Sequence, residues 1–220
     1  MQMIDCNSKA VTDAKPRVRS KSEEKRTAIL AAASDLFLAQ GFDDVNMVAV
    51  AESAGVSKQT VYSHFGSKDE LFSAAIDVRC QKFQLIDMLE DLERPMKETL
   101  TGLAHQFDAL INSYEGLRIY GICAANNVNP GNDSHISELF WQAGPAKVME
   151  AITDYFTAQQ DAGRISLDNP KFAGQQFLFM LQAEENMRRV IGLGVDTNTE
   201  QQDEYLCSCV ELFCRGYGIE

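Results

Sequence analysis

Between Gly55 and Gly66 the sequence places polar side chains where they would share one side of a short helix. Val56, Val61 and Phe65 fall near helical spacing and would face inward, so the polar residues would face outward. The outward set is Lys58, Gln59, Thr60, Tyr62, Ser63 and His64. Lysine and glutamine can hydrogen-bond base edges, threonine can contact the thymine methyl group, and hydroxyl and imidazole groups can bind phosphates. The pattern therefore favours contact with double-stranded DNA over its alternative, a structural hairpin that touches no DNA.

The residues just before this set predict the turn that would position it. Asn46 is a suitable N-cap for a short helix that ends at Gly55, and Ser57 caps the next helix. Gly55 can adopt a positive φ at the turn, while Ala51 and Ala54 allow the two helices to approach closely. This arrangement is a helix-turn-helix, in which the second helix enters the major groove and the first braces it.

Two capping motifs predict the helices on either side. Ser20-x-x-Glu23 opens a helix before the turn, and Ser67-x-x-Glu70 opens a fourth helix that is expected to run toward Leu92. Together these elements form a compact unit that ends near residue 72.

Charge is divided unevenly along the chain. The whole sequence has 20 Lys and Arg against 32 Asp and Glu, a net charge of -12 that is unfavourable for binding a polyanion. Residues 1–70 carry nine basic and ten acidic residues, whereas residues 71–220 carry eleven and twenty-two. Six basic and two acidic residues over 15–26 make a local +4 patch that can meet phosphates. A solvated tail is the alternative interpretation of the arm at 1–19.

The remainder of the chain also has a helical pattern. Helices are predicted over 95–114, 116–129, 132–162, 170–192 and 200–217, and Gly144-Pro145 is expected to kink or split the third of them. Five prolines and long runs rich in Ala, Leu, Glu and Gln favour an all-α fold of about nine helices.

The stretch "RTAILAAASDLFLAQGFDDVNMVAVAESAGVSKQTVYSHFGSKDELF", residues 26–72, resembles the DNA-binding domain of the tetracycline-repressor (TetR) family. The matching elements are "A…LF…GF", "VAVAESAGVSKQTVY" and "HFGSKDELF". The family usually has Thr or Ser in place of Asn46 and Ile-Ala in place of Val50-Ala51; both changes preserve the cap and the core. Less specifically, "ELFWQAGPAKVMEAI" and "AGRISLDNPKFAGQQFLFML" resemble a common C-terminal type among TetR-like regulators.

The resemblance implies an all-α homodimer with three parts. These are a flexible basic arm at 1–19, a three-helix helix-turn-helix domain at 20–72, and a helical effector-binding and dimerisation domain at 73–220. A dimer would present two reading helices about 34 Å apart and bind a palindromic operator. A small-molecule effector in the C-terminal domain would shift the helix that starts near residue 68 and so change the spacing of the two reading helices. Repression that the effector relieves is the expected outcome.

By motif position, the resemblance also implies a set of DNA contacts in four places: the arm, the start of helix two, the reading helix and the start of helix four. These residues are Arg17, Arg19, Lys21, Asn46, Ser57, Lys58, Gln59, Thr60, Tyr62, Ser63, His64 and Lys68.

Aromatic and sulfur-containing side chains in the C-terminal part are candidates for the walls of an effector pocket. The expected set is Tyr114, Tyr120, Phe140, Trp141, Phe156, Phe177 and Met180. Tyr120 and Trp141 are favoured because each has a polar tip beside an apolar body. Plain core packing is the alternative for every member.

Five cysteines of the helical region allow a thiol-switched regulator as an alternative function: Cys80, Cys123, Cys207, Cys209 and Cys214. On a helix Cys207 and Cys214 share a face about 10.5 Å apart, while Cys209 points away. That spacing forbids an intrahelical disulfide and is poor for one tetrahedral metal, so packing in a core or interface is favoured.

Other function classes lack support in the sequence. No nucleophile elbow, phosphate-binding glycine loop or His/Cys metal spacing is present, so no catalytic residue, metal or cofactor is expected. No apolar run long enough for a membrane span and no secretory h-region occur, which predicts a cytoplasmic protein. A helical interaction module that binds no DNA is the remaining alternative.

Overall fold

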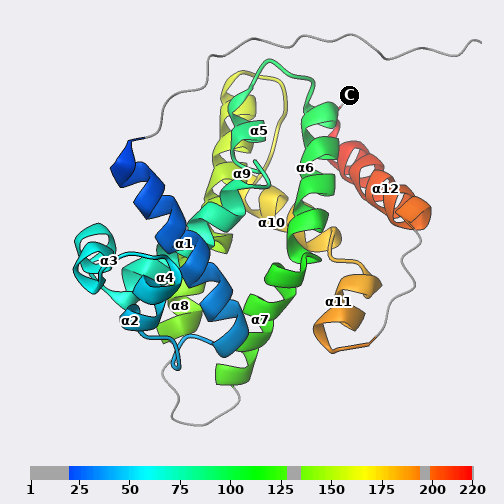
Figure 1. Cartoon of the computed structure of the whole chain (residues 1–220). Helices are drawn as coiled ribbons and strands as arrows, with labels where there is room; N and C mark the ends of the chain where they lie inside the picture. Colours follow the sequence, from blue (N-terminus) through cyan, green and yellow to red (C-terminus); the bar gives the residue numbers. More distant parts are fainter. Residues whose placement is uncertain (1–19, 128–134, 194–198, 220) are drawn as a thin grey trace, which may run out of the picture.

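The computed structural model describes residues 20–127, 135–193 and 199–219 (Figure 1). Within these ranges the chain forms twelve helices and no strand, which confirms the all-α prediction. The number exceeds the expected nine because three predicted helices are each broken in two. No helix in the described ranges is long and apolar enough to cross a membrane.

The four N-terminal helices form where their caps predict them. They are α1 (Lys21–Gln40), α2 (Met47–Ser53), α3 (Lys58–Phe65) and α4 (Lys68–Gln81). Ser20 and Glu23 make both bonds of the capping box. Ser67 makes only one of the two predicted bonds, because its hydroxyl accepts from the Glu70 amide while its own amide donates to the carbonyl of Phe65.

The prediction that α4 runs toward Leu92 is wrong. α4 ends at Gln81, the backbone of Gln84 adopts a φ of +50°, and the short helix α5 (Asp87–Glu90) follows. The turn lets Leu85 and Leu89 enter the C-terminal core, where both are buried. Burial of these side chains thus overrides the helical pattern of the sequence.

The middle of the chain follows the predicted stretches with one shifted break. The helices are α6 (Met96–Ile111), α7 (Tyr114–Asn127), α8 (His135–Ala143) and α9 (Pro145–Asp161). Glu115-Gly116 does not separate α6 from α7, because the Ser113 hydroxyl accepts from the Gly116 amide and the helix is already under way at Tyr114. The split at Gly144-Pro145 is confirmed, with proline in the first turn of α9.

The C-terminal helices are α10 (Pro170–Met180), α11 (Glu184–Val190) and α12 (Thr199–Tyr217). The prediction of one helix over 170–192 is wrong, because the chain leaves the helix after Met180. Leu181 is fully buried in this break, and the Ala183 amide donates to its carbonyl in a tight turn.

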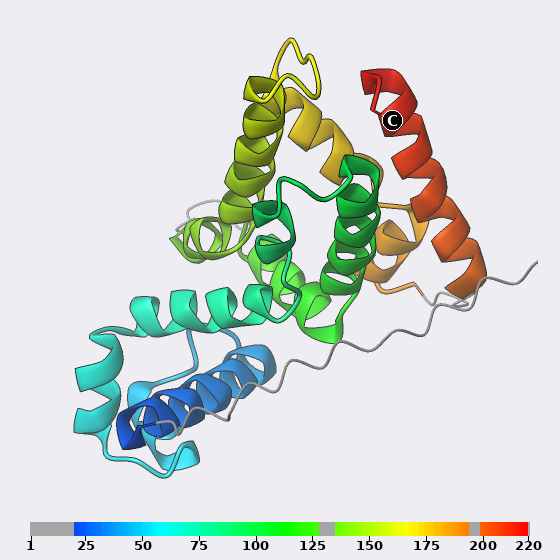
Figure 2. The same ribbon diagram turned by 90° about the horizontal axis from the view of Figure 1, so that it is seen from above.

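Two apolar cores hold these helices together. One combines α1–α4 with side chains of α7 and α8, including Ile119, Cys123 and Ile136. The other lies among α5, α6, α9, α10 and α12 and includes Phe156, Phe177 and Phe213. Figure 2 shows α4 lying along the border between the N-terminal helices and the rest of the molecule. The expected domain boundary at residue 72 falls inside α4, so any movement of this helix affects both sides.

Candidate DNA-binding surface and neighbouring cavities

The start of α3 is shaped by hydroxyl groups that bond one another. The Thr60 amide donates to Ser57 Oγ at 3.1 Å, and the two hydroxyls lie 2.8 Å apart. Ser63 Oγ donates to the Thr60 carbonyl at 2.8 Å. These bonds hold the first turns of α3 in place. The hydroxyl oxygens of Ser57, Thr60 and Ser63 can each still accept a further hydrogen bond.

The remaining outward side chains of α3 present a polar and aromatic surface. Lys58, Gln59 and Tyr62 are exposed, whereas Val61 and Phe65 are buried as predicted. The Lys58 ammonium lies 5.7 Å from the centre of the Tyr62 ring, so the cation and the phenol occupy one patch. A patch of this kind can place a charge and a hydrogen-bonding group on a phosphate or base edge.

Arg26 also belongs to this surface, although it is not among the DNA contacts predicted from the sequence. Its guanidinium lies 4.5 Å from the centre of the Phe65 ring and donates to the carbonyl of His64 at 3.4 Å. It thus holds the C-terminal end of α3 against α1. Its place in the basic patch is visible in the sequence, but its partner is 38 positions away along the chain.

Asn46 and Lys68 both stabilise the segment that joins α1 to α2. Asn46 Oδ1 accepts from the amides of Val48 and Ala49 at 3.0 and 2.9 Å. Lys68 Nζ donates to the carbonyl of Asp43 at 3.0 Å and lies 4.5 Å from the centre of the Phe42 ring. Lys68 therefore also has a structural role.

The other predicted contacts are placed as follows. Lys21 is exposed in the first turn of α1, and His64 is half-buried near the end of α3. Arg17 and Arg19 lie outside the described residues. Asn46, Ser57 and Ser67 cap three successive helices, whose N-terminal amides and dipoles favour an anion.

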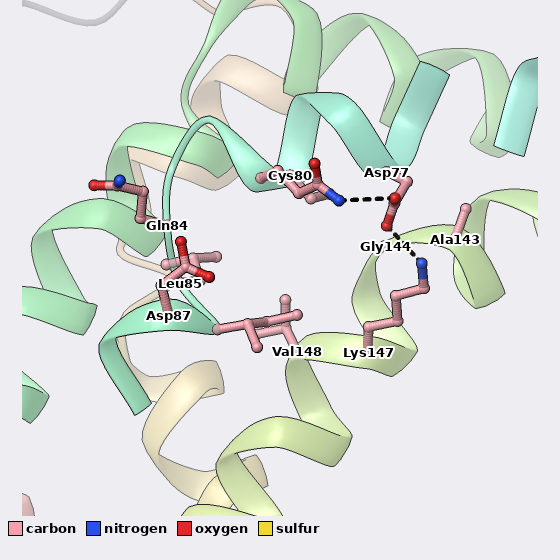
Figure 3. A pocket seen from close by; sticks show the side chains of 11 residues that line it. Asp77, Cys80, Gln84, Leu85, Asp87, Ala143, Gly144, Lys147 and Val148 are labelled. Atoms are coloured by element: carbon pink, nitrogen blue, oxygen red, sulfur yellow. Dashed lines mark hydrogen bonds and ion pairs between the residues drawn. The ribbon is translucent and has the colours of Figure 1, made fainter. Parts of the chain in front are cut away.

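Two cavities flank the last turns of α4, and Cys80 lines both. The first has a volume of about 290 Å³ and lies between α4, the segment 84–87 and the corner from α8 to α9 (Figure 3). The second, of about 230 Å³, lies between α4, the ends of α6 and α7, and Phe140. Gly144 permits the close approach here, because a Cβ atom at this position would lie 3.1 Å from Cys80 Sγ.

Three side-chain contacts, two of them ion pairs with Lys or Arg, join α4 to the helices around these cavities. Asp69 pairs with His135 of α8 at 2.8 Å, Asp77 with Lys147 of α9 at 2.5 Å, and Arg79 with Glu115 of α7 at 2.9 Å. Each reaches a different helix. These contacts connect α4, the helix that follows α3, to α7, α8 and α9.

The structure does not bring the predicted pocket residues together. Phe140 lines the second cavity, and Phe156 and Phe177 are fully buried in the C-terminal core, against which Met180 packs. Tyr114, Tyr120 and Trp141 are exposed. The first cavity near α4 is lined largely by polar and small residues, which an aromatic pattern does not reveal, whereas the second includes Phe83 and Phe140.

The cysteines of the described residues are mostly buried thiols. Burial raises the pKa of Cys80 and of Cys123 to about 11, and it also raises the pKa of Cys209 and Cys214. On α12, Cys209 and Cys214 are both buried in the C-terminal core, whereas Cys207, two turns before Cys214, is exposed. In the described ranges no three His, Cys, Asp or Glu side chains gather as a metal site.

Comparison with known families identifies both parts of the chain. Residues 29–75 match the model of bacterial regulatory proteins of the tetR family, and residues 98–219 match that of the AefR-like transcriptional repressor C-terminal domain. The chain belongs to the TetR family of transcriptional regulators. It is therefore a DNA-binding regulator rather than an enzyme, as the resemblance of residues 26–72 predicts.

Curated relatives of this TetR-family chain are similar over part of their length. The transcriptional activator FasR of Mycolicibacterium smegmatis is 41% identical over 58 residues, 26% of each chain. The transcriptional regulator UidR of Escherichia coli K12 is 31% identical over 103 residues, 46% of each chain. The matched segments thus span about a quarter to about a half of these relatives.

Solved structures share the fold over nearly the whole chain. A TetR-family regulator from Mesorhizobium loti has a TM-score of 0.72 and 22% identity, covering 90% of this chain and 99% of that one. The flavonoid-responsive regulator FrrA has a TM-score of 0.67 and 27% identity, covering 88% and 97%. The helix-turn-helix and the C-terminal helical domain are thus arranged as in other family members.

Proposed function

We propose that this regulator is a dimeric repressor that binds a palindromic operator and is released by a small-molecule effector. The exposed polar surface of α3 carries the proposal, because it is the one surface built from the residues of the family's reading helix. Proposed DNA contacts are Lys21, Asn46, the outward residues from Ser57 to His64, and Lys68, together with Arg17 and Arg19 of the arm.

Repression is favoured over activation by the C-terminal match. FasR is an activator, but it is similar over only 26% of this chain. The match to an AefR-like repressor domain covers residues 98–219, the part that would receive the effector. The name of FrrA supports a small-molecule response in a regulator of this fold.

An apolar face on α10 and α12 supports a dimer. Phe172 and Phe179 are seven residues apart on α10 and are 57% and 58% exposed, and Leu212 on α12 is 64% exposed. Tyr205 of α12 donates to the Met180 carbonyl at 2.8 Å, which keeps the two helices side by side. Large apolar side chains exposed on neighbouring helices are typical of an interface, and a second copy of the chain would cover them.

The thiol-switch alternative receives less support. A thiol with a pKa of about 11 is almost entirely protonated at neutral pH, and the protonated form is a poor nucleophile. Cys80 and Cys123 are therefore poorly suited to sensing oxidants, and binding of a small molecule remains the proposed signal.

The test is an electrophoretic shift of DNA from upstream of the protein's own gene. Purified protein should retard this fragment at about 50 mM salt and lose most of its affinity at about 200 mM salt. A scrambled fragment of equal length is the control. If the upstream fragment is not retarded at low salt, or if the scrambled DNA is retarded equally, the proposed operator binding is wrong.

A further inference from the structure

The cavity in Figure 3 has one polar side that is already neutralised. Asp77 accepts from Lys147 Nζ at 2.5 Å and from Gln81 Nε2 at 2.9 Å. Lys147 stands in the first turn of α9, where the helix dipole also favours a negative charge. Asp77 thus occupies the place that an anionic ligand would need, so an anion would have to displace it.

The opposite side of the cavity also carries an acidic side chain. Figure 3 shows Gln84 and Asp87 across the cavity from the Asp77–Lys147 pair. Within the part of the chain that the structure describes, Asp87 has no ion-pair partner. The α5 side of the cavity therefore presents an unpaired carboxylate that is exposed to solvent.

Between these two polar sides the lining is apolar. Leu85 and Ile86 come from the segment before α5, and Ala143 and Val148 come from the corner of α8 and α9. At about 290 Å³ the cavity is at the small end of the range for ligand sites. It suits a compact apolar body with a group that donates hydrogen bonds or carries a positive charge.

We propose that this cavity binds a small organic amine, with the ammonium at Asp87 and Gln84 and the apolar body against Leu85 and Val148. Such a ligand would contact α4, the segment before α5 and the start of α9 together. It would stabilise one arrangement of α4 relative to α9 beside the Asp77–Lys147 pair. This consequence for regulation rests on the proposed function, whereas binding itself does not.

The test is calorimetric titration of the full chain without DNA, using tryptamine, phenethylamine and benzylamine as probes. Tryptophol and indole-3-propionate are the neutral and anionic counterparts of tryptamine. We expect tryptamine to bind about tenfold tighter than tryptophol, or ~1.4 kcal/mol, and indole-3-propionate to bind more weakly still. Failure of all three amines to bind, or binding of the acid as tightly as the amine, overturns the proposal.

Two matched variants locate the site. Asp87→Asn should abolish the preference for the amine over the alcohol. Glu90→Gln should keep it, because Glu90 is exposed on the same short helix and does not line the cavity. Persistence of the preference in Asp87→Asn, with an unchanged melting temperature, overturns the assignment. If the wild-type protein binds operator DNA in a salt-dependent way but binds no amine, only this proposal is rejected. If it binds the amines but does not bind operator DNA, only the proposed operator binding is rejected.

Discussion

The ammonium of Lys147 on α9 lies 2.5 Å from the carboxylate of Asp77 on α4 and connects the start of α9 to the helix that follows α3. Both side chains are partly exposed, 46% and 33% respectively. Solvent therefore screens the pair, and its contribution to the free energy of unfolding is small.

Replacing Lys147 with methionine tests the strength of this connection. We expect Lys147→Met to lower the free energy of unfolding by about 0.5–1 kcal/mol at low salt, with the difference shrinking in concentrated salt. Urea unfolding measures the change. Lys171→Met on α10 is the control, because Lys171 is exposed and has no ion-pair partner among the described residues. Equal effects of the two substitutions would show that the pair contributes nothing.

Substitutions of Lys68 and Tyr62 should both weaken DNA binding, but only the Lys68 substitution should also destabilise the fold. Lys68 also holds the Asp43 carbonyl and the Phe42 ring, so Lys68→Ala should weaken operator binding and lower stability by about 1 kcal/mol. Tyr62 is 43% exposed, so Tyr62→Ala should weaken operator binding with little change in melting temperature. Fluorescence anisotropy with operator DNA and thermal melts measure the two effects. An unchanged melting temperature for Lys68→Ala would contradict the structural role.

Local contacts explain which parts of this fold could be predicted from the sequence. The caps at Ser20, Asn46 and Ser57 each bond to a residue two or three positions away, so a short motif contains both partners. The end of α4 could not be predicted in the same way. It depends on the burial of Leu85 and Leu89 by helices that are distant in the sequence.

The cavities show a second limit of sequence patterns. Aromatic spacing marks amphipathic side chains without showing which face is covered, and so Phe156 lies in the core while Tyr114 is exposed. The cavity of Figure 3 exists partly because Ala143 and Gly144 are small. Small residues at a corner between two helices do not predict a cavity from the sequence, because the cavity forms only when the neighbouring helix packs against the corner.

The face of α10 and α12 should control the oligomeric state. Phe179→Glu places a charge within the exposed apolar face, and burying an unpaired charge in an interface is costly. We therefore expect the variant to be a monomer by light scattering after size exclusion, and to lose operator affinity because a monomer contacts one half-site. Tyr114→Glu is the control, since Tyr114 is 68% exposed on a different helix. A dimer with Phe179→Glu would place the interface elsewhere.

The half-buried thiol of Cys80 should make the fold less stable at alkaline pH. Burial and the nearby Asp77 carboxylate raise its pKa from 9.0 to about 11, so above pH 9 the unfolded chain releases this proton while the folded protein keeps it. The stability contribution is complete below pH 9 and falls by up to ~1.4 kcal/mol per pH unit between pH 9 and about 11. Urea unfolding across this range should show a shallower decline in Cys80→Ala than in the wild type, with parallel curves from pH 7 to about 8.5. Identical declines would mean that Cys80 titrates alike in both states.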